Sequence, residues 1–325
     1  MIQSTFHSAF FNIIAVCLGL SALTNGFLSL WDSGFYLFEL SSHFQLQIFI
    51  LNIIFLCLFL VSAYHIKLNK AAKLGIVSLI LALMINVFHL WPYYTPWYKT
   101  VDIKQDGPSY SLLQANVFKF NFETGPLLDL IQDKDPDLLV FSEVTFQWAE
   151  ALKKLEDRWP HSLVLPEDGS HGMAVYSKIP FENTKTEFMS ALDIPSFIID
   201  FKDFRLVSIH PLPPVSQFYY LNRNAHFKWM VSQEKQLTSR PLIVAGDMNT
   251  TMFAPSYQKF IRALDLKNAR YGRGIQNSWI YNKNPVLAIP IDHFLHTDSI
   301  GIIDSKVYPS INSDHLPIFT KFSIY

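Results

Sequence analysis

Apolar positions follow two different patterns along this chain of 325 residues. In the first third they form nearly unbroken runs, each long enough to cross a bilayer, which takes about 20 residues of helix. The runs are Phe10–Leu30, Leu46–Ile66 and Leu74–Trp91. Apolar helices of a soluble core are the alternative, but core helices rarely lack a polar face over such a length. We therefore predict three transmembrane helices, at about 10–30, 46–66 and 74–91, within a membrane anchor formed by residues 1–98.

The rest of the chain alternates short apolar runs with helical patterns, which indicates a mixed α/β domain. We predict a polar linker at 99–109 and a folded domain at 110–325. The predicted strands are Tyr110–Ala115, Leu138–Ser142, Met173–Ser177, Phe197–Phe201, Phe204–Ile209, Leu242–Ala245, Ile291–His296 and Leu316–Phe322. The predicted helices are Glu123–Gln132, Phe146–Asp157, Gln217–Gln236 and Pro255–Ala263.

The placement of charge gives the predicted anchor an orientation. Lys67, Lys70 and Lys73 lie between the second and third apolar runs, whereas Asp32 and Glu39 lie between the first and second. Short lysine-rich loops stay in the cytoplasm. We therefore expect a multi-pass protein of the cell (inner) membrane, with the folded domain on the extracytoplasmic, periplasmic side.

Cysteine content and net charge restrict the chemistry of the folded domain. Both cysteines, Cys17 and Cys57, fall in predicted spans, so thiolate metal sites and a cysteine nucleophile are excluded from the domain. Of the 26 basic and 27 acidic residues, three lysines and two acids lie in residues 1–98, which leaves 23 basic and 25 acidic residues and a net charge of −2. The domain therefore has no broad basic surface of the kind that attracts polynucleotides.

Polar side chains follow several of the predicted strands, and they are the residue types of a metal-dependent hydrolase. They are Asn116, Glu143, His210, Asp247, Asn249, Asp292, Asp314 and His315. Magnesium prefers one or two carboxylate oxygens and keeps several waters, so we predict Glu143 and Asp314 as metal ligands. Asn116 would either assist the ion or orient the carboxylate. Taken singly, Glu143 and Asn116 each also suit a strand-end cap or a turn.

The remaining polar positions suggest how water and phosphate would be handled. Asp247 and Asn249 are two residues apart, so in extended geometry both face one side, where the aspartate can accept a proton from water. Asp292 with His315 would form a dyad in which the carboxylate fixes the imidazole tautomer. His210 would donate to a phosphoryl oxygen in the transition state. A turn after the strand, for Asp247 and Asn249, and a structural hydrogen bond, for His210, are the simpler alternatives.

These motifs in this order, NVF, SEVT, SIHP, GDMN, IDH and SDH, resemble the endonuclease/exonuclease/phosphatase superfamily from about Tyr110 to the C-terminus. The superfamily includes deoxyribonucleases, abasic-site endonucleases, inositol polyphosphate 5-phosphatases and neutral sphingomyelinases. The resemblance implies a four-layer α/β/β/α sandwich with the site at one end. It also implies that Asn116, Glu143 and Asp314 hold the metal, while His210, Asp247, Asn249, Asp292 and His315 are catalytic. Where abasic-site enzymes carry an acid, this chain has Phe118, which disfavours a repair enzyme.

The residues between the GDMN and IDH motifs add a further expectation. Residues 256–279 are similar to bacterial members of the superfamily that carry N-terminal membrane spans, and Arg270 and Arg273 could bind a substrate phosphate. We therefore expect a membrane-anchored phosphodiesterase or phosphatase that uses Mg²⁺ or Mn²⁺. Its partners would be the lipid bilayer and a phosphoester substrate, which could be a phospholipid, a nucleic acid or a small ester, and no protein partner is inferable. The alternative is a membrane-tethered binding module of the same fold without catalytic activity.

Overall fold

The structure, a computed structural model, describes residues 2–65, 68–98 and 107–325 and divides into two compact units. The first unit comprises Met1–Pro92 with Phe253–Pro255, and the second comprises Tyr93–Met252 with Ser256–Tyr325. Most of the predicted linker at 99–109 lies outside the described residues.

The first unit is helical, with α1 (Ile2–Leu30), α2 (Tyr36–Ser42), α3 (Gln45–His65) and α4 (Lys70–Tyr94), whose last two residues belong to the second unit. Among the described residues, α4 alone is long and apolar enough to cross a membrane by itself. Helix α2 with residues 45–61 of α3 passes only as a pair that is bent by 67°. The described residues therefore support one or two candidate spans rather than the three that we predicted.

Buried polar side chains link α3 and α4. Asn86 of α4 donates to Gln45 (2.7 Å) and accepts from Asn52 of α3 (3.0 Å), and all three side chains are buried. Such bonds between helices satisfy polar groups that would otherwise face an apolar environment.

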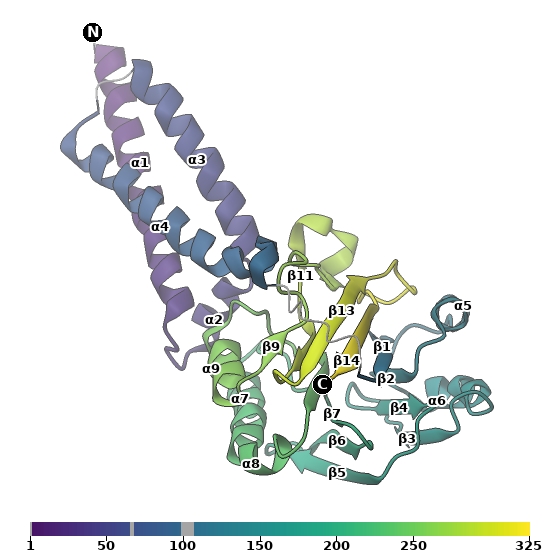
Figure 1. The fold of residues 1–325 in the computed structure, drawn as a ribbon. Helices are drawn as coiled ribbons and strands as arrows, with labels where there is room; N and C mark the ends of the chain where they lie inside the picture. Colours follow the sequence, from purple (N-terminus) through teal and green to yellow (C-terminus); the bar gives the residue numbers. More distant parts are fainter. Residues whose placement is uncertain (1, 66–67, 99–106) are drawn as a thin grey trace. The chain divides into compact units, whose positions relative to one another are not determined.

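The second unit contains two six-stranded sheets (Figure 1). In order across the first sheet, the strands are β13 (Ile300–Val307), β14 (Ile318–Ile324), β1 (Ser109–Asn116), β2 (Leu138–Ser142), β4 (Met173–Ser177) and β3 (His161–Leu165). The second sheet has the order β5 (Asn183–Met189), β6 (Ile194–Asp200), β7 (Arg205–Ile209), β8 (Leu242–Asp247), β12 (Asp292–His296) and β9 (Lys267–Asn268). A separate pair is formed by β10 (Trp279–Ile280) and β11 (Ala288–Ile289).

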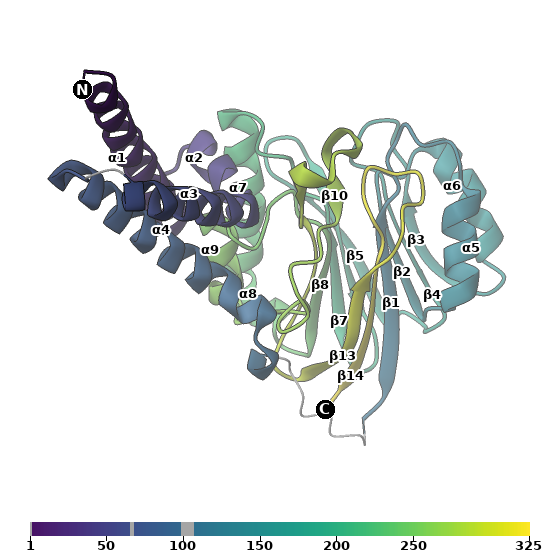
Figure 2. The same cartoon turned by 90° about the horizontal axis from the view of Figure 1, so that it is seen from above.

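Helices cover the outer faces of both sheets. They are α5 (Gly125–Lys134) and α6 (Phe146–Leu152) on the first sheet, and α7 (Gln217–Ser232), α8 (Glu234–Leu237) and α9 (Pro255–Ala263) on the side of the second. Figure 2 shows α5 and α6 on one side of the sheets and α7 on the other. Short 3₁₀ turns occupy Pro96–Tyr98, Lys153–Leu155, Tyr281–Lys283 and Pro285–Leu287. The mixed α/β sandwich that we predicted is confirmed.

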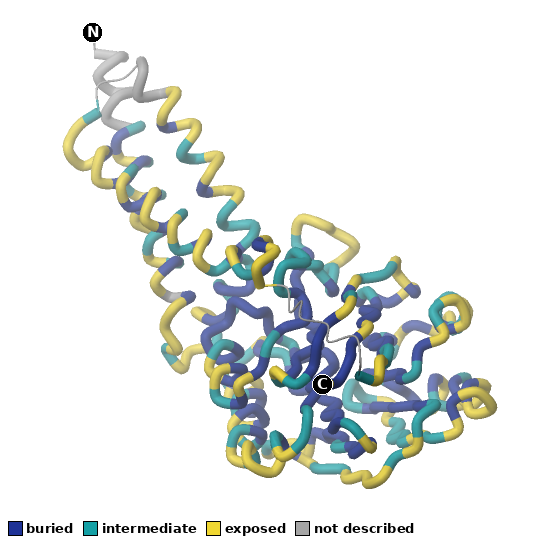
Figure 3. Tube along the Cα trace, in the orientation of Figure 1, coloured by how far each residue is buried: buried dark blue, intermediate teal, exposed yellow. Residues whose placement is uncertain are grey.

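Successive side chains of a strand point to opposite faces of the sheet, and this alternation explains how each strand packs on both sides. In β1, Leu112 packs into the core between the sheets, while Leu113 packs outward against α5 and α6. On the other side, the rings of Phe227 in α7 and Phe260 in α9 stack with centroids 4.7 Å apart. The central strands are accordingly buried on both faces, as the dark tube in Figure 3 shows.

All eight predicted strands and all four predicted helices of this unit are present, with ends that shift by a few residues. The strand after Asp203 begins at Arg205, and the predicted helix at Gln217–Gln236 is divided into α7 and α8. Strands β3, β5, β9, β10, β11 and β13 were not predicted.

Candidate active site

The strand pairing brings the predicted polar residues together at the ends of neighbouring strands. Parallel β1 and β2 place Asn116 opposite Ser142, so Glu143 follows directly beside it. Antiparallel β8 and β12 place Asp247 opposite Asp292, so the end of one strand meets the start of the other. Because β14 runs antiparallel to β1, with Gln114 opposite Ile318, residues just before β14 return to the same edge.

Asp247 is the centre of a hydrogen-bonded group. Its Oδ1 accepts the N–H of Asn249 at 2.8 Å, and its Oδ2 accepts the side-chain N–H of Asn116 at 3.1 Å. The Nε2 atoms of His210 and His315 lie 3.4 and 3.6 Å from the same Oδ2. The Asp247 side chain is almost fully buried. Burial raises the pKa of Asp247, but His315, His210 and the Asn249 N–H outweigh it and lower the pKa to about 2, so the carboxylate is ionised.

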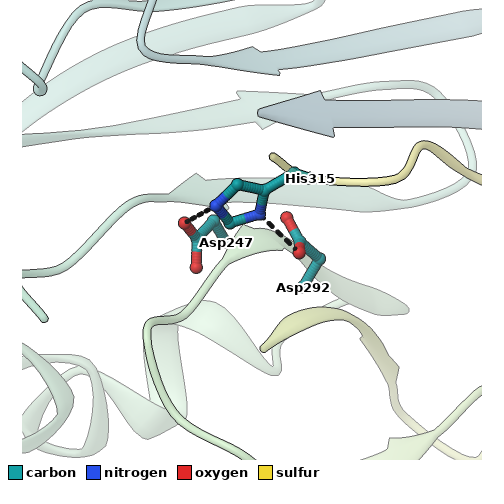
Figure 4. Close-up of side chains that lie close together, drawn as sticks. All are labelled: Asp247, Asp292 and His315. Atoms are coloured by element: carbon teal, nitrogen blue, oxygen red, sulfur yellow. Dashed lines mark hydrogen bonds and ion pairs between the residues drawn. The ribbon is translucent and has the colours of Figure 1, made fainter. Parts of the chain in front are cut away.

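His315 and Asp292 form the predicted dyad, with Nδ1 2.9 Å from Asp292 Oδ2 (Figure 4). A carboxylate accepts only, so Nδ1 carries the proton and Nε2 points to Asp247. Burial lowers the pKa of His315, but the two carboxylates, Asp292 and Asp247, raise it to about 10. In the absence of a bound cation, His315 is therefore a buried imidazolium held between two anions.

Glu143 and Asn116 are linked to this group and to each other. The Asn116 amide donates to Glu143 Oε1 and to Asp247 Oδ2, both at 3.1 Å, and its Oδ1 accepts the Phe118 N–H at 3.0 Å. Glu143 Oε2 accepts the Lys119 N–H at 3.0 Å. Of the two roles that the sequence left open for Asn116, this geometry favours orientation of the carboxylates.

Asp314 has one oxygen bound and one without a partner. Its Oδ2 accepts the indole N–H of Trp279 at 2.9 Å, whereas its Oδ1 is buried with no hydrogen-bond partner among the described residues. Burial raises the pKa of Asp314, and the nearby Glu143 carboxylate adds to the rise. Two neighbouring carboxylates with an unsatisfied buried oxygen are the donor set that a hard divalent cation requires, so Glu143 and Asp314 fit a metal ion.

A second group could also hold a cation. Asp247, Asp292 and His315 each offer one ligand atom, and these atoms lie within 4.8 Å of one another. However, Asp292 Oδ2 and His315 Nδ1 already bind each other. We therefore interpret these three residues as a chain of polar contacts, and the binding of a cation by Glu143 and Asp314 stays a prediction.

His210 and His171 form a pair of imidazoles beside the carboxylates. Their ring centroids are 6.3 Å apart, and the Nδ1 atom of each is buried without a partner in the described part of the chain. Burial lowers the pKa of His210, but hydrogen bonding to Asp247 and its negative charge raise it overall. Sequence reasoning missed His171, because it lies in a loop before β4 rather than at the end of an apolar run.

The two arginines lie in a different environment. Arg270 is buried and donates to the Gln276 carbonyl, while Arg273 donates to the carbonyls of Ala269, Tyr271 and Ile302. Both guanidinium groups are thus engaged with backbone oxygens that stabilise this loop. Their contact with a substrate phosphate stays a prediction.

The backbone is held in an unusual conformation at three positions of the site. Phe118, Glu143 and Asn249 have φ values of 61°, 60° and 49°, in the left-handed region that non-glycine residues seldom adopt. Such strain persists only where surrounding contacts impose it, and it is concentrated at functional sites.

Comparison with known proteins identifies the fold. A sequence profile of the endonuclease/exonuclease/phosphatase family matches residues 113–315, more than half of the chain. The human Nocturnin catalytic domain with bound sulfate aligns at 18% identity and a TM-score of 0.55, over 69% of this chain and 96% of that one. The Neisseria 3′ phosphatase NExo, bound to a product DNA hairpin, aligns at 16% identity and a TM-score of 0.55, over 66% and 99%. An endonuclease/exonuclease/phosphatase protein from Bacteroides vulgatus aligns at 14% identity and 0.55, over 67% and 100%. No curated protein sequence matches.

Proposed function

Because the chain belongs to the endonuclease/exonuclease/phosphatase family, whose members are metal-dependent phosphoric ester hydrolases, we propose that it hydrolyses a phosphoester by in-line attack of water. The observation that carries this proposal is the buried arrangement of Asp247, His315 and Asp292 at the shared strand edge. A carboxylate and an imidazole in this order can hold a water molecule and a phosphate oxygen in fixed positions.

Each residue has a role that its contacts support. Asp247 and Asn249 orient the attacking water, and the His315 imidazolium, held by Asp292, donates to a phosphate oxygen. His210, whose Nε2 also lies near Asp247 Oδ2, would be a second donor to the phosphate. Glu143 and Asp314 would hold Mg²⁺ or Mn²⁺, and the Asn116 amide would orient Glu143. When bound, such a cation neutralises charge that develops on the phosphoryl oxygens.

The direct test uses the full chain in detergent with bis-p-nitrophenyl phosphate as substrate. Turnover should require Mg²⁺ or Mn²⁺, stop with a chelator and return when the metal is restored. Asp247→Asn and His315→Gln should each abolish it while the protein remains folded. Metal-independent turnover would contradict the proposed role of the cation, and no turnover under any condition would support the binding module.

The substrate class can be narrowed by the surface beside the site. Phe120 and Phe122 lie on the loop after β1 and are 65% and 66% exposed, and Phe146 begins α6 after β2 and is 60% exposed. Exposed aromatic side chains in such a place favour a substrate with an apolar portion, such as a phospholipid or an unpaired base. The DNA product bound to NExo supports a nucleic acid, whereas the apolar helices support a lipid. Sphingomyelin, inositol phosphates and supercoiled DNA should therefore be assayed in parallel.

We also propose that α4 anchors the protein in the cell (inner) membrane. Lys70 and Lys73 lie at its N-terminal end, which the positive-inside rule places in the cytoplasm, so the catalytic unit that follows would be periplasmic. This orientation of α4 does not depend on how many spans precede it. A single cysteine at the exposed Lys185, with Cys17 and Cys57 changed to serine, should react with a membrane-impermeant maleimide in intact spheroplasts. Protection until lysis would reverse the orientation.

A further inference from the structure

We propose that Trp279 is a positioning residue for the metal site: its indole N–H holds Asp314 so that the second carboxylate oxygen is presented to the cation. This inference rests on the proposed function, because it takes Asp314 as a metal ligand. It adds a residue that neither the sequence motifs nor the strand-end positions indicated.

The first support is the contact itself. The indole N–H donates to Asp314 Oδ2 at 2.9 Å, while Oδ1 is buried and has no partner among the described residues. A buried carboxyl oxygen left without a partner in this way costs free energy unless a ligand binds it. Indole is a neutral donor, so it fixes the carboxylate without cancelling the charge that a cation needs.

The second support is the backbone around Trp279. Residues Trp279 and His315 form an antiparallel bridge, the Ile280 N–H donates to the Asp314 carbonyl at 2.9 Å, and the Leu316 N–H donates to the Ser278 carbonyl at 2.6 Å. Backbone hydrogen bonds therefore join the short segment at 278–280 to the segment at 314–316. The position of the indole relative to Asp314 is set by this pairing rather than by a free side chain.

The same segment also fixes the other half of the dyad. The Oγ of Ser278, which is fully buried, accepts the N–H groups of Ile291 at 3.2 Å and Asp292 at 3.0 Å. Residues 278–280 thus tie the backbone at Asp292 to the backbone at His315. One short element controls both the spacing of the dyad and the direction of Asp314.

A purely structural role for Trp279 makes a different prediction. A buried indole usually finds an acceptor, and loss of such a bond would lower stability without changing metal affinity. A partner that orients a metal ligand has another signature, since its loss typically weakens metal binding 10- to 100-fold. Metal affinity therefore separates the two roles.

The experiment measures Mn²⁺ binding by isothermal titration calorimetry on the full chain in detergent, together with circular dichroism and thermal unfolding in EDTA. Trp279→Phe, which keeps an aromatic ring but loses the donor, should bind Mn²⁺ about 10- to 100-fold more weakly at an unchanged unfolding temperature. Trp279→His, which restores a ring N–H, should recover part of the affinity. Trp229→Phe on α7 is the matched control and should bind as the unchanged protein does.

The outcomes distinguish this inference from the function on which it rests. If Asp314→Asn binds Mn²⁺ normally, the proposed metal site itself is wrong. If Asp314→Asn loses binding but Trp279→Phe does not, only the positioning role is overturned. Loss of the fold in both Trp279 variants would also overturn it, in favour of a structural role.

Discussion

Asp247 and Asp292 are direct partners in the antiparallel ladder between β8 and β12. Two buried carboxylates on neighbouring strands repel each other, and each would be costly without a compensating charge. His315 supplies it, with Nδ1 on Asp292 and Nε2 directed at Asp247. The strand register thus places two carboxylates side by side. The His315 imidazolium, which lies just before β14, compensates their negative charge.

Removing one of the two carboxylates should therefore disable the imidazole. We expect Asp292→Asn to lower kcat on bis-p-nitrophenyl phosphate by about 10²- to 10⁴-fold, because His315 loses the anion that fixes its tautomer. Mn²⁺ affinity should stay nearly the same. Asp298→Asn, at an exposed carboxylate paired with Lys267, is the control and should be neutral. Activity that survives in Asp292→Asn would exclude the dyad from the reaction.

The residue before Asp247 allows a second test, of how the strand places that carboxylate. Gly246 has a φ of 135°, and a Cβ there would lie 2.2 Å from the Ile209 carbonyl oxygen. We expect Gly246→Ala to destabilise the second unit by about 3 kcal/mol through backbone strain and the clash. That corresponds to a fall of about 6–12 °C in unfolding temperature for a unit of this size.

Gly125→Ala is a matched control for this substitution. A Cβ at Gly125, at the start of α5, meets nothing within 4 Å, so the change should be neutral or slightly stabilising. Equal unfolding temperatures for the two variants would show that the close approach of β7 to Gly246 is not maintained in solution.

Sequence patterns located the central strands but not the edges of the sheets. The eight predicted strands are all interior, whereas β13, β3, β5 and β9 form the four edges. Interior strands bury both faces and therefore read as continuous apolar runs. An edge strand such as β5, NTKTEFM, is mostly exposed and carries charges that prevent further pairing, so no apolar alternation marks it.

Position relative to the interior strands also determines which site residues the sequence predicts. Glu143, His210 and Asp247 directly follow or end interior strands, so the apolar runs led to them. Trp279 lies on a two-residue strand, and His171 lies in a loop. Their proximity to the carboxylates depends on pairings between distant segments, which no local pattern encodes.

Metal binding should be visible as stability as well as activity. A cation that binds only the folded state at 100 times its Kd should stabilise it by about 2.7 kcal/mol. We therefore expect Mg²⁺ to raise the unfolding temperature of the second unit, and Glu143→Gln to remove most of this rise by deleting a ligand charge. Glu150→Gln, at an exposed surface carboxylate, is the control. If Mg²⁺ raises the unfolding temperature of Glu143→Gln as much as that of the unchanged protein, the cation binds instead to the group formed by Asp247, Asp292 and His315.

Acid should destabilise the second unit because it contains buried histidines. Burial lowers the pKa of His226 to about 3 and that of His296 to about 4, whereas an unfolded histidine titrates near 6.5. Below pH 6.5 these two histidines therefore bind protons in the unfolded chain but not in the native state. The contribution of these two histidines to stability is complete above pH 6.5 and falls as the pH drops toward 4, by about 1.4 kcal/mol per pH unit for each histidine.

Between pH 6.5 and 5.0 the two histidines together should cost about 4 kcal/mol. His315 does not offset this, because its raised pKa adds stability that is already complete below pH 6.5 and is lost only as the pH rises toward 10. Urea unfolding at pH 7.5, 6.0 and 5.0, followed by tryptophan fluorescence, measures the slope. His226→Gln and His296→Gln should each reduce the slope, and the double variant should reduce it further than either. A slope that is the same in the double variant would show that these side chains gain protons without unfolding, and hence that water reaches them in the native state.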